Sequence, residues 1–153
     1  MLGLFAGCAS APPQPSERQA SNRTGSAPTQ QRTKVGERAA AVALSQVGVP
    51  YRYGGSGTSG FDCSGLIQYA YRQAGKSVPR TTGQLWAATA TVDMNQLQEG
   101  DLLFFKVAGK MSHVGLYLGE HRFVHAPSSG RTVAVESLKS PFYAAALLRA
   151  GRP

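Results

Sequence analysis

The sequence predicts an α+β domain in which helices pack on one side of an antiparallel β-sheet. Three observations support this fold class. Apolar residues recur at helical spacing between about residues 35 and 90, and the period changes to that of short strands after residue 100. Gly, Pro and Ser residues separate the strand-like segments. The helices precede the strands instead of alternating with them, which is the order found in α+β folds.

The predicted helical region contains three helices. In VGERAAAVALSQVG (35–48), apolar residues recur at near-helical spacing, and the last glycine ends the pattern. The next stretch, VPYRYGGSGTSGFD (49–62), has four glycines in fourteen residues and is predicted to be a loop. A second amphipathic helix is predicted over 64–75. A third, shorter helix is predicted in TTGQLWAATA (81–90), with one of its two leading threonines as the cap.

Four short segments rich in β-branched or aromatic residues are the predicted strands. They are DLLFFKVA (101–108), SHVGLYLG (112–119), RFVHAP (122–127) and TVAVESL (132–138). Turn residues lie between them at hairpin spacing, so neighbouring segments are expected to pair antiparallel.

The N-terminal region differs in composition from the rest of the chain. Residues 1–8, MLGLFAGC, are apolar and end in small residues before Cys8, as at the end of a bacterial lipoprotein signal. We therefore expect Cys8 to be lipidated, and the alternative is an apolar N-terminus with an incidental cysteine. Residues 9–34 contain no aromatic residue and no aliphatic one larger than Ala, which predicts a disordered tether. The folded domain is then expected to span 35–153.

Charge and cysteine content exclude several functional classes. The chain of 153 residues carries a formal charge of +8, of which +5 lies on the predicted domain, and this indicates an anionic partner. Because the basic residues do not cluster with aromatic ones, we do not expect nucleic acid to be that partner. No Cys-x-x-Cys is present, and no zinc site is expected.

Cys63 has unusual neighbours for a buried cysteine. It follows Asp62 and precedes Ser64, at the point where the glycine-rich loop is predicted to become a helix. Asp62 or Ser64 can cap that helix, and the positive potential at a helix N-terminus stabilises a thiolate. On these residues alone, a nucleophilic thiol and an inert buried thiol remain open.

Two histidines favour the nucleophile. Side chains alternate between the two faces of a strand, and Val114, Leu116 and Leu118 share the face that should enter the core. The side chain of His113 should therefore lie on the opposite face. His125 is expected on the same side if the connecting hairpin contains a bulge or an odd loop, for which Gly119 can supply a positive φ. Each histidine can then orient the other. His121 lies in the turn and is expected to be solvated.

Five blocks, in order, resemble the NlpC family of bacterial cell-wall cysteine peptidases, and most resemble its compact lipoprotein endopeptidases of the Spr/MepS type. The blocks are GVPYRYGGSGTSGFDCSGLIQYAY, VPRTTGQ, LQEGDLLFF, SHVGLYLG and FVHAPSSG, and the match runs from about residue 36 to 148. The resemblance implies a reduced papain-like fold with its nucleophile at a helix start. It also implies no metal and no organic cofactor.

The resemblance implies specific roles for the residues in these blocks. Cys63 takes the place of the nucleophile, His113 that of the general base and His125 that of the residue holding the imidazole. Tyr51, from the YxYGG block, is expected to bind substrate or to stabilise the oxyanion.

Three further polar residues are candidates for substrate contact. Asp62 and Ser64 resemble family positions that touch the substrate, although a plain helix cap is an equal alternative for Asp62. Arg80 can meet a substrate carboxylate, or it can form a structural ion pair.

The function implied is amide hydrolysis through a thioester in the peptide part of peptidoglycan, a polymer that carries free carboxylates. An amidase or acyltransferase on another substrate, and a catalytically silent wall-binding module, are the alternatives. We expect a monomer held by its lipid at the periplasmic face of the outer membrane, because Ala9 and Ser10 follow the cysteine. Whether the stem peptide or the cross-link between stems is cut is left open.

Overall fold

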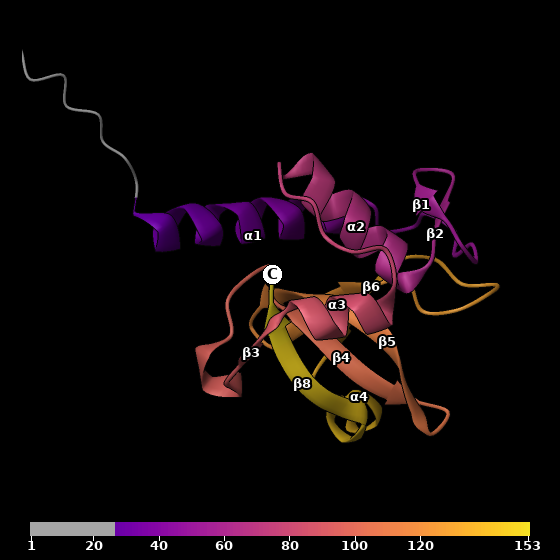
Figure 1. Ribbon diagram of the computed structural model, residues 1–153. Helices are drawn as coiled ribbons and strands as arrows, with labels where there is room; N and C mark the ends of the chain where they lie inside the picture. The colour runs from indigo at the N-terminus through magenta and orange to yellow at the C-terminus, as the bar shows by residue number, and fades with distance from the viewer. Residues whose placement is uncertain (1–26) are drawn as a thin grey trace, which may run out of the picture.

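The computed structural model describes residues 27–153, which form helices stacked on a six-stranded antiparallel sheet with the strand order β3-β8-β4-β5-β6-β7 (Figure 1). The helices are α1 (Pro28–Leu44), α2 (Cys63–Gln73), α3 (Thr82–Ala88), η1 (Met94–Gln96, a 3-10 turn) and α4 (Pro141–Ala146). The strands of the sheet are β3 (Ala90–Val92), β4 (Leu102–Val107), β5 (Lys110–Gly119), β6 (Arg122–His125), β7 (Ala134–Ser137) and β8 (Leu147–Arg152). A separate two-stranded ribbon joins β1 (Ser56–Gly57) to β2 (Gly60–Phe61).

The predicted α+β class and the four predicted strands are confirmed. β4, β5, β6 and β7 pair in chain order as an antiparallel meander. The sequence did not indicate β8, which inserts between β3 and β4. The last strand in the chain is therefore an interior strand of the sheet.

The first helix is longer than predicted. α1 begins at Pro28, where the ring's fixed φ suits the first helical position, so residues 28–34 are helical although we predicted them as part of a tether. They are polar and mostly exposed, so no apolar pattern marked them. The rest of that tether, the predicted signal segment and Cys8 lie outside the described residues.

Helix α1 approaches the body of the molecule closely enough to require glycine. A Cβ atom placed on Gly36 would lie 2.6 Å from the carbonyl oxygen of Glu99. Gly100, which adopts a φ of +95°, lies against the same helix, and a Cβ there would lie 2.3 Å from the Gly36 Cα. These two glycines allow backbone-to-backbone packing of α1 on the turn before β4.

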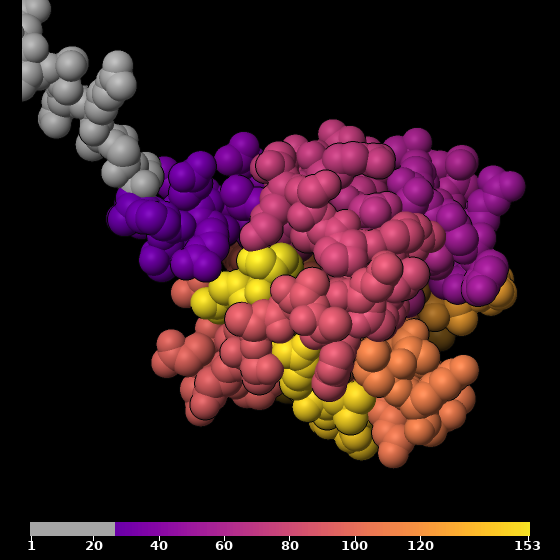
Figure 2. Space-filling model, viewed as in Figure 1, coloured from indigo at the N-terminus to yellow at the C-terminus, as the bar shows by residue number. Residues whose placement is uncertain are grey.

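Both faces of the sheet are covered, as the alternation along β4 shows. Leu102 and Phe104 belong to a core shared with α1, α2 and α3, whereas Leu103 and Phe105 belong to a second core that includes residues of α4. In Figure 1, α1 and α2 lie above the sheet and α4 lies at its lower end. In Figure 2, yellow C-terminal residues lie directly below the indigo helix α1.

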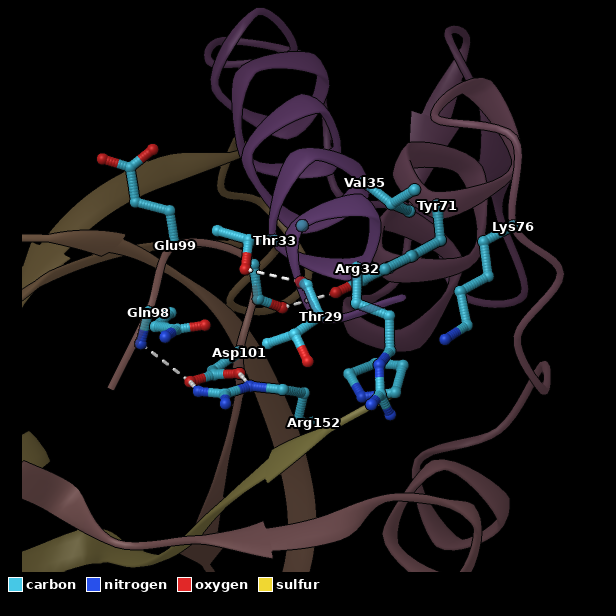
Figure 3. Close-up of a pocket in the computed structure, with 13 residues that line it drawn as sticks. Thr29, Arg32, Thr33, Val35, Tyr71, Lys76, Gln98, Glu99, Asp101 and Arg152 are labelled. Atoms are coloured by element: carbon cyan, nitrogen blue, oxygen red, sulfur yellow. Dashed lines mark hydrogen bonds and ion pairs between the residues drawn. The ribbon is translucent and has the colours of Figure 1, made fainter. Parts of the chain in front are cut away.

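An ion pair attaches β8 to the turn before β4. Arg152 donates to both carboxylate oxygens of Asp101, at 2.7 Å each, and the Gln98 amide also donates to Asp101 (Figure 3). Asp101 is 2% exposed, so the ion pair satisfies an otherwise isolated buried charge. Within residues 27–153, no helix is both long and apolar enough to cross a membrane.

Candidate active site

Cys63 is the first residue of α2, as predicted. Asp62 is the N-cap residue, and its Oδ1 accepts a hydrogen bond from the Gly65 amide at 2.7 Å. This confirms Asp62 as the helix cap. In the described chain, the amides of Cys63 and Ser64 have no acceptor, as is usual for the first N–H groups of a helix.

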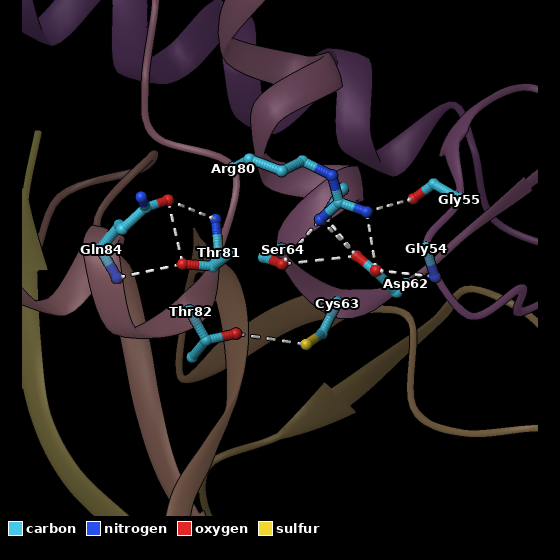
Figure 4. Close-up of polar contacts among 10 residues, drawn as sticks. Gly54, Gly55, Asp62, Cys63, Ser64, Arg80, Thr81, Thr82 and Gln84 are labelled. Carbon is cyan, nitrogen blue, oxygen red and sulfur yellow. Dashed lines mark hydrogen bonds and ion pairs between the residues drawn. The ribbon is translucent and has the colours of Figure 1, made fainter.

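The cap is held in place by an arginine (Figure 4). Arg80 donates to Asp62 through both guanidinium nitrogens, at 2.9 and 2.7 Å, and also to the Ser64 hydroxyl at 3.0 Å. The Gly54 amide donates to the remaining face of the same carboxylate at 3.0 Å. The arrangement is the structural ion pair considered for Arg80, and it ties the glycine-rich loop to the helix start.

His113 and His125 lie on neighbouring strands and are in direct contact. His113 comes from β5 and His125 from β6, and their Nε2 and Nδ1 atoms share a hydrogen bond of 2.7 Å. The hairpin between them has a register shift after Tyr117, and Gly119 has a φ of +83°. The expected bulge and positive φ are therefore present, and they place both imidazoles on one side of the sheet.

Burial keeps both imidazoles neutral near pH 7. His113 is 8% exposed and His125 only 1% exposed. Desolvation lowers the pKa of His113 to about 4, and it lowers the pKa of His125 to about 3, with smaller contributions from His113 and Arg131. Since Nε2 of His113 is bonded to His125, Nδ1 is left as the nitrogen that can accept a proton.

A cavity of about 300 Å³ brings the candidate catalytic residues together. Tyr51, Cys63, His113 and His125 all line it. The Cys63 Sγ atom lies 3.6 Å from the Thr82 hydroxyl, a contact that the sequence did not indicate. Three of the predicted substrate-contact residues do not line this cavity. They are Asp62, Ser64 and Arg80, which form a hydrogen-bonded cluster at the start of α2. His121 is exposed in the β5–β6 turn, as expected.

Tyr51 is positioned to act as a hydrogen-bond donor. Its backbone amide donates to the Arg131 carbonyl at 2.8 Å, which fixes the tyrosine at the edge of the cavity. Burial, followed by the nearby Cys63 and Asp62, raises the pKa of its phenol. The hydroxyl therefore keeps its proton near neutral pH.

Tyr143 is a site residue that the sequence analysis missed. It lies in α4, and its hydroxyl is 3.5 Å from Nε2 of His125. Its ring meets the His125 ring edge to face, with centroids 5.5 Å apart. No motif marks this residue, because it reaches the histidine only through the packing of α4 on the sheet.

A second cavity of about 140 Å³ lies between α1, the end of α2 and the C-terminus (Figure 3). None of the candidate catalytic residues lines it. Within residues 27–153, no group of three or more His, Cys, Asp or Glu side chains is placed to hold a metal ion.

Sequence comparison relates the chain to a family of known proteins. The model of the NlpC/P60 family matches residues 48–152. Murein DD-endopeptidase MepH of Escherichia coli K12 is 38% identical over 106 residues, which cover 65% of this chain and 39% of that protein. Probable endopeptidase p60 of Listeria monocytogenes is 40% identical over 90 residues, which cover 59% of this chain and 19% of that protein. The chain thus spans less than half the length of these curated relatives.

Solved structures confirm the predicted fold. The crystal structure of an NlpC/P60 family protein from Bacillus cereus ATCC 10987 superposes with a TM-score of 0.70 at 31% identity, covering 75% of this chain and 39% of that one. The NlpC/p60 domain of the peptidoglycan hydrolase SagA superposes with a TM-score of 0.67 at 35% identity, covering 76% of this chain and 97% of that domain. The predicted resemblance to this family is therefore confirmed.

Proposed function

Because the chain belongs to the NlpC/P60 family, we propose that it is a peptidoglycan endopeptidase that hydrolyses amide bonds through the thiol of Cys63. The observation that carries the proposal is the single cavity lined by a helix-start thiol and by two hydrogen-bonded, neutral imidazoles. A nucleophile, a base with one free nitrogen and a group that orients the base are the parts that acyl transfer needs.

Acylation begins with attack of the Cys63 sulfur on the substrate carbonyl carbon. The thiol proton passes to Nδ1 of His113, which is available because burial keeps that ring neutral. The carbonyl oxygen becomes an oxyanion, and the amides of Cys63 and Ser64 stabilise it at the start of α2. The hydroxyl of Tyr51 is a further donor beside the same thiol.

Breakdown of the tetrahedral intermediate returns the proton. His113 donates it to the leaving amine as the carbon–nitrogen bond breaks, which leaves a thioester on Cys63. Water then gives a proton to His113 and attacks the thioester, and the cysteine thiol is restored as the acid product leaves. His125 accepts from Nε2 of His113 throughout and so stabilises the imidazolium formed in each half-reaction.

The cluster of Asp62, Ser64 and Arg80 supports this chemistry by positioning the start of α2. Its hydrogen bonds hold the start of α2, and with it the thiol and the two free amides, in a fixed position. The Asp62 carboxylate already accepts four hydrogen bonds from Arg80, Gly54 and Gly65, which favours a positioning role over substrate contact for this residue.

The cross-link between stem peptides is the bond that we propose for cleavage. The support is the name of the 38%-identical relative MepH, a murein DD-endopeptidase. The test is digestion of purified cross-linked muropeptides by the full chain, followed by mass spectrometry of the products. Conversion of dimers to intact monomers is expected, whereas shortened stems would assign the cut to a bond within one stem.

The same digestion separates the rival functions. Release of a group other than a stem peptide would indicate an amidase or acyltransferase on another substrate. Binding to sacculi without any change in muropeptide masses would indicate a silent wall-binding module, and it would overturn the proposed enzymatic activity.

We further propose that Cys8 anchors the protein by lipid to the periplasmic face of the outer membrane, as a monomer. The support is the run of small residues before Cys8 and the Ala9-Ser10 pair after it. Labelling with radioactive palmitate and membrane fractionation test the anchor. The wild-type chain should carry label and fractionate with the outer membrane, and Cys8→Ser should do neither. Sedimentation of the unlipidated chain tests the monomer.

A further inference from the structure

The catalytic cavity is lined by an arginine that the proposed chemistry does not use. Among its lining residues in the described part of the chain there is no Asp or Glu. Both lining histidines are neutral near pH 7, because burial lowers the pKa of each. Of the lining residues between 27 and 153, Arg131 is the one with a permanent charge.

The backbone of Arg131 is fixed at the edge of the catalytic cavity. Its carbonyl accepts a hydrogen bond from the Tyr51 amide at 2.8 Å, and its own amide donates to the Ser128 carbonyl at 3.2 Å. Two residues later, Val133 and Val49 pair at 2.8 Å and continue the same short ladder. The guanidinium is therefore carried by an ordered segment that spans the edge of the cavity.

The side chain of Arg131 has no protein partner in the part of the chain that the structure describes. It is exposed and takes part in no hydrogen bond or ion pair. By contrast, Arg80 and Arg152 each bind a carboxylate through two hydrogen bonds. Arg131 thus keeps its paired donors free at the edge of the catalytic cavity.

We propose that Arg131 binds a free carboxylate of the peptide substrate next to the scissile amide and selects stems that carry this group. The inference rests on the proposed function, whose substrate polymer carries free carboxylates. A guanidinium offers two parallel N–H donors that match the two oxygens of a carboxylate, and a carboxamide offers only one such oxygen. Amidation of the stem would then weaken binding.

The test uses two synthetic cross-linked stem-peptide dimers, one with free carboxylates and one with those carboxylates converted to carboxamides. Dissociation constants are measured by calorimetry with the full-length Cys63→Ala variant, so that binding is read without cleavage. We expect the carboxylate dimer to bind about tenfold more tightly, the size of one hydrogen bond to a charged group. Adding Arg131→Ala should remove this preference, and Arg131→Lys should keep part of it.

The matched control is Arg38→Ala, which removes an exposed arginine on α1 that does not line the cavity. It should leave the tenfold preference unchanged. Equal affinity of the Cys63→Ala variant for both dimers, or a preference that survives Arg131→Ala, would overturn the inference. Hydrolysis of the carboxylate dimer by the wild-type chain is measured in parallel. If it fails while the binding preference holds, the proposed function is wrong and the carboxylate site stands.

Discussion

Nε2 of His113 lies 2.7 Å from Nδ1 of His125, so one of the two rings donates a hydrogen bond to the other. For Nδ1 of His113 to accept the thiol proton, Nε2 of the same ring must carry hydrogen and donate to His125. His125 then carries its own hydrogen on Nε2, the atom that lies 3.5 Å from the Tyr143 hydroxyl. A chain of donors therefore runs from the nucleophile side of the cavity to α4.

Tyr143→Phe tests the last link of this chain. Loss of the hydroxyl removes the acceptor for His125 and allows the other tautomer, so we expect kcat to fall about three- to tenfold with KM unchanged, the value of one neutral hydrogen bond. Nitrogen-15 NMR of the histidine rings should show mixed tautomers of His125 in the variant. Tyr69→Phe, on α2 and outside the cavity, is the control. If kcat and the ring shifts match those of the wild type, Tyr143 has no role in setting the tautomer.

The acid limb of the pH–rate profile should reflect the burial of His113. The base works only as neutral imidazole, and desolvation lowers its pKa to about 4. Activity should therefore persist well below pH 6.5 and decline as pH approaches about 4, when kcat/KM is measured on a soluble muropeptide. Circular dichroism at each pH separates loss of the base from loss of the fold. A decline centred near pH 6.5 in folded protein would show that His113 is not the buried base described above.

Folding stability should fall with acid for the same physical reason. The folded-state pKa of His113 lies below that of the unfolded chain, so the unfolded state binds more protons between about pH 6.5 and 4. Stability is thus complete above about pH 6.5 and decreases as pH falls towards 4, by on the order of 3 kcal/mol from this residue. Urea unfolding of the wild type and of His113→Gln, at pH 7 and at pH 4.5, measures this loss of unfolding free energy. The wild type should lose more stability than His113→Gln over this interval, and equal losses would contradict the prediction.

Arg80→Ala, which removes a partly buried ion pair at the start of α2, should lower the stability of the protein more than Arg122→Ala, which removes an exposed one. The Arg80 and Asp62 side chains are 30% and 15% exposed, and their contact has two hydrogen bonds. We expect a loss of about 1–2 kcal/mol in unfolding free energy, together with lower kcat because the thiol and its neighbouring amides are less well fixed. Arg122→Ala breaks the exposed pair with Glu120 and should cost less than about 0.5 kcal/mol. Equal effects of the two variants on stability and kcat would remove the positioning role from Arg80.

The pattern of apolar residues carried most of the fold prediction. In β5, Val114, Leu116 and Leu118 enter the core with the helices, and His113 lies on the opposite side, as the alternation predicted. The pattern did not predict the strand at 147–152, where Leu-Leu is followed by Arg-Ala-Gly-Arg without apolar alternation. This segment nevertheless forms β8, an interior strand of the sheet. Its strand identity comes from its pairing with β3 and β4, which are distant in sequence.

The candidate site, like the fold, was only partly predictable from the sequence. Cys63, His113 and His125 were identified from local chemistry, namely a helix-start thiol and imidazoles at hairpin spacing, and the structure brings all three into one cavity. Thr82 and Tyr143 were missed because each meets the site only through tertiary packing of a short helix. The residues around a site are therefore harder to predict than its reactive centre.

The central claim is that the Cys63 thiol, with His113 as base, hydrolyses peptidoglycan. Its most direct test is the rate at which full-length Cys63→Ala and His113→Gln convert purified cross-linked muropeptides, relative to the wild type, with circular dichroism confirming that both variants fold. We predict that each variant loses activity by a factor of at least about 10³, because the nucleophile and its base act as one unit. A folded Cys63→Ala variant that digests muropeptides at the wild-type rate would contradict the account.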